Sequence, residues 1–134
     1  MELKKSYKGF IIWLIAMCVA IFGCVLIPTD DAALVTRIVM NTSTISLAVL
    51  TWIVYKTENV YWYNGISYEE ARKASSDRRK LYAWTHCRRF GMFALVYLLI
   101  SVAAHMLQVS FWLDIVIGTV GLIVAALGTI KIKL

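Results

Sequence analysis

The sequence predicts an all-α integral membrane protein whose four transmembrane helices form a bundle of two hairpins. Three observations point to this class. The chain of 134 residues is 60% hydrophobic and only 16% charged, whereas a soluble domain carries about 25% charged residues. It contains apolar runs close to the roughly 20 residues that a helix needs to cross a bilayer. Its Lys and Arg residues lie almost entirely outside those runs. We expect a single domain over residues 1–134.

The first hairpin is expected to consist of spans over residues 9–27 and 32–55. Residues 9–27 are continuously apolar and are followed by the sequence PTDD. A cleaved signal peptide has a shorter apolar region and ends in small residues, so an uncleaved first span is favoured. Pro28 ends that helix. The second span is less apolar, because it carries Arg37, Asn41 and several Ser and Thr residues.

The second hairpin is expected to consist of spans over residues 90–109 and 111–130, separated by a tight turn at Ser110. Each span is apolar enough to cross a bilayer. The third contains His105, and the fourth has Asp114 near its start. These two residues and Arg37 are the ionisable side chains within the predicted spans.

The polar segment 56–89 connects the two hairpins and is predicted to contain helix of its own. Ser67 and Glu70 have the spacing of a capping box, in which each residue bonds the backbone of the other. A helix is therefore expected to start there and to continue into the third span, with a break near Ser75 and Ser76.

The segment 56–89 also carries residues that suit a membrane surface. Its aromatic triplet is expected to anchor the chain at the level of the lipid head groups, and consists of Tyr61, Trp62 and Tyr63. Its basic and aromatic helical residues are expected to contact anionic head groups or a partner protein, and are Arg78, Arg79, Lys80, Trp84, Arg88 and Arg89. The alternative is that these charges only fix the topology.

The distribution of basic residues predicts the orientation. Residues 1–8 carry three Lys, segment 56–89 carries eight Lys and Arg, and the tail after residue 130 carries two. With four spans all of these lie on one side, whereas the other side has Asp30 and Asp31 in its turns. Because basic loops stay in the cytoplasm, both termini are expected to be cytoplasmic in a plasma membrane. The short turns favour a prokaryotic source. The net charge of +6 then indicates attraction to anionic lipids, not to nucleic acid.

Helices in lipid associate through small and polar residues, and each predicted span has a row of them at alternating spacings of three and four. The rows on the first hairpin are Gly9, Trp13, Ala16, Ala20 and Gly23, and Arg37, Asn41, Thr44, Ala48, Thr51 and Tyr55. The rows on the second hairpin are Gly91, Ala94, Leu98, Ser101, His105 and Gln108, and Asp114, Gly118, Gly121, Ala125 and Gly128. These rows predict a compact four-helix bundle.

Three ionisable residues are expected to meet in that bundle. At a rise of 1.5 Å per residue, Arg37, His105 and Asp114 each lie within about 10 Å of the non-cytoplasmic end of their span. A charge at membrane depth costs several kcal/mol unless it is paired or hydrated. We therefore predict that Arg37 pairs with Asp114, with His105 and Asn41 nearby. The pair has three possible roles: a structural contact, a solute or proton site, or side chains that reach to the interface.

The sequence offers no recognisable catalytic, metal or cofactor motif. It has no Cys-x-x-Cys and no glycine-rich phosphate loop, and its two histidines, His86 and His105, are too far apart along one helix to clamp a haem. Cys18 and Cys24 are expected on different helix faces and therefore not bridged. We expect a non-enzymatic accessory or interaction subunit that docks onto another membrane protein. The alternative is a homodimeric transporter or channel for a small solute or ion, using Arg37, His105 and Asp114.

Overall fold

The computed structural model describes residues 3–63, 65–130 and 132–134, and over these residues it contains helices and no strand. The helices are α1 (Lys8–Val25), α2 (Ala32–Thr57), the short 3-10 helix η1 (Val60–Trp62), α3 (Tyr68–Lys73), α4 (Ser76–Met106) and α5 (Phe111–Ile130). In the described part of the chain, four of them, α1, α2, α4 and α5, are long and apolar enough to cross a membrane. Lys131, in the predicted basic tail, lies outside the described residues.

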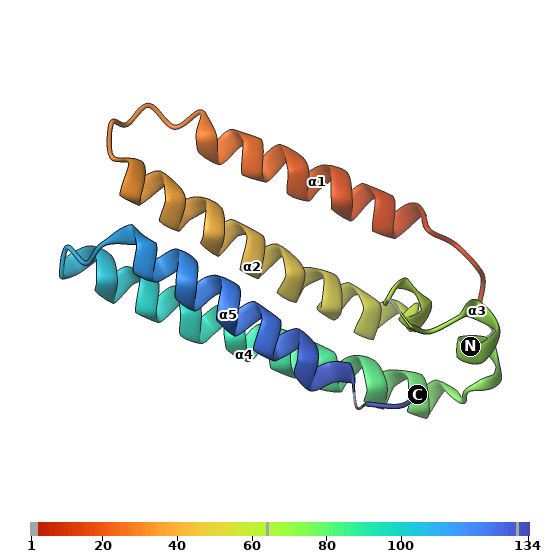
Figure 1. Cartoon of the computed structure of the whole chain (residues 1–134). Coiled ribbons are helices and arrows are strands. Elements are labelled where there is room, and N and C mark those ends of the chain that lie inside the picture. Colours follow the sequence, from red (N-terminus) through yellow and green to blue (C-terminus); the bar gives the residue numbers. More distant parts are fainter. Residues whose placement is uncertain (1–2, 64, 131) are drawn as a thin grey trace.

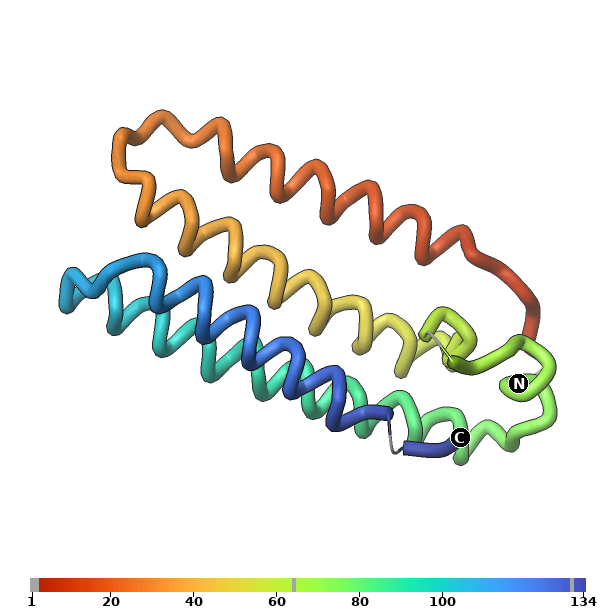
Figure 2. The backbone as a smooth tube through the Cα atoms, in the orientation of Figure 1, coloured from red at the N-terminus to blue at the C-terminus, as the bar shows by residue number. Residues whose placement is uncertain are grey.

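The four long helices run side by side, with both hairpin turns at one end (Figure 1). We call this the turn end. Segment 58–75, the start of α4 and the two chain termini gather at the other end, which we call the cap (Figure 2). The helix α2 packs against α4 and α5, while α1 lies along the outer side of α2.

Local side-chain bonds fix the helix starts. The Asp31 carboxylate accepts a hydrogen bond from the backbone of Leu34 at the start of α2. Ser67 and Glu70 form the predicted capping box at the start of α3. The side chain of Ser75 caps α4, so the predicted break before this helix is confirmed. The third span is therefore the apolar part of a longer helix, from about Phe90 onward.

Small residues allow α5 to approach α2 and α4 closely. Gly118 is buried, and a Cβ atom at this position would lie 2.6 Å from Met40 Cε and 3.1 Å from the Tyr97 ring. Ala94 and Ser101 of α4 are buried on the predicted row of that helix. The rows predicted for α4 and α5 therefore mark part of the packed interface.

The packing predicted for the first span is wrong at three of its small residues. Ala16, Ala20 and Gly23 are exposed, and nothing lies within 4 Å of the position of a Cβ at Gly23. No residue of α1 is buried, although the indole of Trp13 donates to the Ser46 carbonyl of α2 at 2.9 Å. Large side chains rather than small ones hold α1 against α2, and α1 stands at the edge of the bundle.

The cap has an apolar core of its own, built from Val54, Val60, Tyr61, Ala71, Tyr82 and Ala83 with Leu50. The N-terminal segment lies over it: the Ser6 backbone N–H donates to the Tyr61 hydroxyl at 2.8 Å, and the Tyr68 hydroxyl donates to the Leu3 carbonyl at 2.7 Å. Tyr61 is only 5% exposed. The predicted aromatic anchor is therefore wrong for this residue, because its ring fills the cap core.

Candidate functional site

The ionisable residues of the spans meet in one cluster near the turn end. The Arg37 Nε donates to Asp114 Oδ2 at 2.9 Å, its Nη2 donates to the Val109 carbonyl at 2.5 Å, and its Nη1 lies 3.3 Å from His105 Nδ1. Because a guanidinium can only donate, Nδ1 of His105 accepts in this contact. The predicted pairing of Arg37 with Asp114 is present in the structure, and His105 contacts the same guanidinium.

Three further side chains, those of Asn41, Ser101 and Tyr97, lie around the pair. The Asn41 amide donates at 2.8 Å both to the Arg37 carbonyl and to the Ser101 hydroxyl, and the Tyr97 hydroxyl donates to the Asp114 carbonyl at 3.2 Å. Asp114 is 1% exposed and Arg37 is 5% exposed. Asn41 Oδ1 and Asp114 Oδ1 are buried and have no hydrogen-bond partner among the described residues. The cluster thus joins α2, α4 and α5 and retains two unused acceptors.

A cavity of about 290 Å³ lies beside this cluster, between α2 and α4. We call it the lateral cavity. Its polar lining consists of Arg37, Asn41, Thr42, Ser101 and His105, and its apolar lining includes Leu34 and Met106 of the two helices. The predicted binding residues Arg37, Asn41 and His105 therefore line one space, whereas Asp114 lies behind Arg37.

A second buried ion pair, which the sequence did not indicate, stabilises the cap. Arg79 donates to Glu58 Oε2 through Nε at 3.0 Å and through Nη2 at 2.8 Å, and to the Ala74 carbonyl at 2.5 Å. The Ser76 hydroxyl donates to the other Glu58 oxygen at 2.7 Å. The prediction that Arg79 contacts lipid or a partner is wrong, because this side chain is buried and paired with Glu58.

The environment of Glu58 favours its charged form. Burial alone would raise the pKa of this carboxyl, but hydrogen bonds from Ser76 and Arg79, with the charges of Arg79 and Lys80, outweigh it and lower the pKa below 4.5. Glu58 also has a left-handed backbone, with φ of 59°, at the residue that follows α2. A contact between a loop residue and a helix 21 positions away leaves no periodic signal in the sequence.

The remaining residues predicted to contact the membrane surface are all exposed. They are Arg78, Lys80, Trp84, Arg88 and Arg89. The Lys80 amine also lies 3.6 Å from Glu58, and Arg89 donates to the Gly128 carbonyl, which ties α4 to the end of α5. That these side chains contact a membrane surface or a partner stays a prediction.

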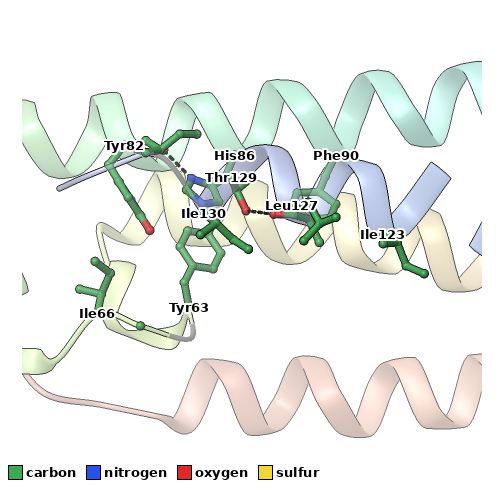
Figure 3. A pocket seen from close by; sticks show the side chains of 12 residues that line it. Tyr63, Ile66, Tyr82, His86, Phe90, Ile123, Leu127, Thr129 and Ile130 are labelled. Carbon is green, nitrogen blue, oxygen red and sulfur yellow. Dashed lines mark hydrogen bonds between the residues drawn. The ribbon is translucent and has the colours of Figure 1, made fainter. Parts of the chain in front are cut away.

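The cap holds a larger cavity of about 560 Å³ between α4, α5 and the segment after η1. We call it the cap cavity. Figure 3 shows the side chains that line it, which include Tyr63, Tyr82, His86 and Phe90 and, from α5, Ile123, Leu127 and Ile130. The rings of Tyr63 and His86 are stacked, with centroids 4.6 Å apart and planes inclined by 17°. Aromatic and aliphatic side chains thus supply most of its lining.

His86 is the buried polar group of this cavity. Its Nδ1 lies 2.9 Å from the Tyr82 carbonyl, and because a carbonyl only accepts, Nδ1 carries the proton. His86 precedes the apolar part of α4, and burial lowers its pKa, which favours the neutral ring. Its Nε2 is then an acceptor, and no described residue bonds to it.

Within the described residues, no three His, Cys, Asp or Glu side chains come close enough to hold a metal ion. The three cysteines, Cys18, Cys24 and Cys87, are free thiols. No protein-family model, curated protein or solved structure matches this chain significantly.

Proposed function

We propose that this protein is a small non-enzymatic subunit that docks onto another membrane protein through α1. It resides in a plasma membrane, in a prokaryotic cell, with the cap and both termini in the cytoplasm. The orientation follows from charge: Lys and Arg residues are concentrated in the segments of the cap, whereas Asp30 and Asp31 lie in the turn between α1 and α2.

The packing of α1 is the observation that carries the docking proposal. This helix has no buried residue, yet one side carries Ala16, Ala20 and Gly23, all exposed. Small residues at this spacing allow a second helix to approach closely, and that approach drives association in lipid. A lipid-facing helix has no need of such a row, whereas a helix that receives a partner does.

The exposed cations of the cap support the same proposal. Lys80 and Arg88 are exposed, and each basic residue near an anionic leaflet contributes about 1 kcal/mol of attraction. They hold the cap at the cytoplasmic surface, where they are also available to a partner's acidic residues.

Substitution on α1 tests the docking proposal. Ala20→Leu places a bulky side chain in the small-residue row, and Cys18→Leu adds similar bulk on an exposed position outside it. Affinity purification in mild detergent from the native membrane should recover a second membrane protein with the wild type and with Cys18→Leu. Ala20→Leu should lose it. Recovery of the wild type as a lone monomer contradicts the proposal.

A second candidate function is a homodimeric transporter or channel for a small solute or ion, which the lateral cavity favours. Its polar lining of Arg37, Asn41 and His105 gives a charged solute hydrogen bonds and an opposite charge at membrane depth. Against it, Thr44 and Thr51, further along α2, donate to carbonyls of their own helix and offer less to a solute. Flux into proteoliposomes should fall in Asp114→Asn and Arg37→Ala, and unchanged flux in both variants excludes this function.

A further inference from the structure

A second hollow with a different lining adjoins the cap cavity. This hollow has a volume of about 550 Å³ and shares Gly65, Ile66, Ile130 and Ile132 with the cap cavity. Its charged lining consists of Lys73, Arg78, Lys133 and one acidic residue, Glu70. We call it the basic hollow. The Glu70 carboxylate accepts two hydrogen bonds from Ser67 through Oε2 and stays charged, so three cations face one anion and the lining keeps an excess of positive charge.

The two spaces form one amphipathic site at the end of the apolar helices. At one extreme Phe90 and Ile123 provide apolar walls, and at the other Lys73, Arg78 and Lys133 provide positive charge. The volume of the cap cavity is within the range of about 300–1,000 Å³ that is common for ligand sites. An apolar chain that leads to an anionic group matches this order of linings.

His86 lies between the apolar walls and the cations, and it sets a third requirement for a ligand. The residue is only 5% exposed. Its Nε2 atom has no hydrogen-bond partner among the described residues, but this atom is not completely enclosed by the protein. An unpaired acceptor in an apolar cavity is costly unless a donor reaches it. An ester and a fully ionised phosphate offer only acceptors to it, whereas a free hydroxyl of a phospholipid offers a donor.

We propose that the cap cavity and the basic hollow together bind a single-chain anionic phospholipid. The acyl chain lies between α4 and α5, the free glycerol hydroxyl donates to His86, and the phosphate lies among Lys73, Arg78 and Lys133. A lysophospholipid presents chain, hydroxyl and phosphate in this order. A diacyl phospholipid carries an ester in place of the hydroxyl, and it needs room for a second chain. This site is independent of the docking face on α1.

Four probes applied to the wild-type protein in detergent test the site without any substitution. Native mass spectrometry should detect binding of 1-oleoyl lysophosphatidate. Binding should be about fivefold weaker or more for mono-oleoylglycerol, which lacks the phosphate, and for dioleoyl phosphatidate, which lacks the hydroxyl. Inorganic phosphate should not compete at equal concentration, because it has no chain. Equal binding of the mono- and diacyl phosphatidates, or competition by phosphate alone, overturns the proposal.

Substitutions then locate the site. Lys73→Gln and Arg78→Gln should each weaken lysophosphatidate about fivefold, while Arg88→Gln, an exposed cation that lines neither space, should leave affinity unchanged. His86→Phe keeps a flat ring against Tyr63 but removes the acceptor, so it should reduce the preference for the lysolipid over dioleoyl phosphatidate to the part that comes from the second chain. An equal loss in Arg88→Gln shows general surface attraction and contradicts the site. A preserved preference in a folded His86→Phe variant, verified by its helical circular dichroism, contradicts the role of His86.

Discussion

The buried pair of Arg37 and Asp114 should be more sensitive to loss of the arginine than to loss of the acid. Arg37→Met removes the guanidinium and its contacts with Asp114, Val109 and His105. The Asp114 carboxylate then has no cation, and its Oδ1 already has no partner. Asp114→Asn, by contrast, keeps an oxygen that can accept from Arg37 Nε.

These contacts give the expected magnitudes. Breaking a buried ion pair from one side costs about 3–5 kcal/mol, and we expect a loss of this size in Arg37→Met. Asp114→Asn leaves the guanidinium without its anion but conserves an acceptor for Nε and the contacts with Val109 and His105, so we expect a smaller loss than in Arg37→Met. In Arg37→Met with Asp114→Leu no charge remains, and apolar replacement of a buried pair is often neutral. The double variant should therefore recover at least half of the loss.

Reversible unfolding in mixed micelles of mild detergent and dodecyl sulfate, followed by the far-ultraviolet circular dichroism of the helices, measures these free energies. Arg37→Met, Asp114→Leu and the double variant form a double-mutant cycle, and Asp114→Asn is measured beside them. A control, Gly23→Ala, changes an exposed position with nothing within 4 Å and should stay within about 0.5 kcal/mol of the wild type. Additive losses in the double variant, or Asp114→Asn as damaging as Arg37→Met, would refute the assignment of the pair as a mutually dependent contact.

Three further predictions concern local contacts. Because folding lowers the pKa of Glu58, this residue contributes to stability above about pH 4.5, and the contribution is lost as the pH falls through the folded pKa. Hydrogen exchange at the start of α4 should accelerate in that pH range in the wild type. Glu58→Gln should remove this pH dependence. Ser67→Ala, which removes the capping box, should cost about 1 kcal/mol and increase exchange in α3, with unchanged exchange in α5 as the control. Gly118→Val, whose side chain would overlap Met40 and Tyr97, should destabilise the protein by about 1–3 kcal/mol or more, whereas Gly91→Val, with nothing within 4 Å, should cost less than about 1 kcal/mol in the same unfolding assay.

The features that the sequence predicted well are those that depend on neighbours along the chain. The apolar runs predicted spans that correspond closely to α1, α2 and α5, because crossing a bilayer requires only length and composition. The capping box at Ser67 and the break at Ser75 were also predictable, since a cap is formed by residues three positions apart.

The sequence predicted only those residues of the candidate site whose charge costs free energy when it is unpaired in the membrane. Arg37, His105 and Asp114 stand out because a charge in an apolar run has few stable arrangements, and pairing is one of them. The contact between Glu58 and Arg79 carries no such signal, because charged residues in a polar segment are ordinary. The contact between Glu58 and Arg79 could be identified only from the fold, in which η1 and α3 bring the end of α2 to the start of α4.

The sequence by itself determined four apolar helices, the position of the polar segment between two hairpins, and the residues that could not remain unpaired in lipid. Only the tertiary structure decided which helix faces meet, because apolar side chains gain little free energy when they contact one another instead of lipid tails. It placed α1 at the edge with Ala16, Ala20 and Gly23 exposed, and it closed the cap over Tyr61. It also created the cavity at His86 from three segments that are distant in the chain, which no local pattern specifies.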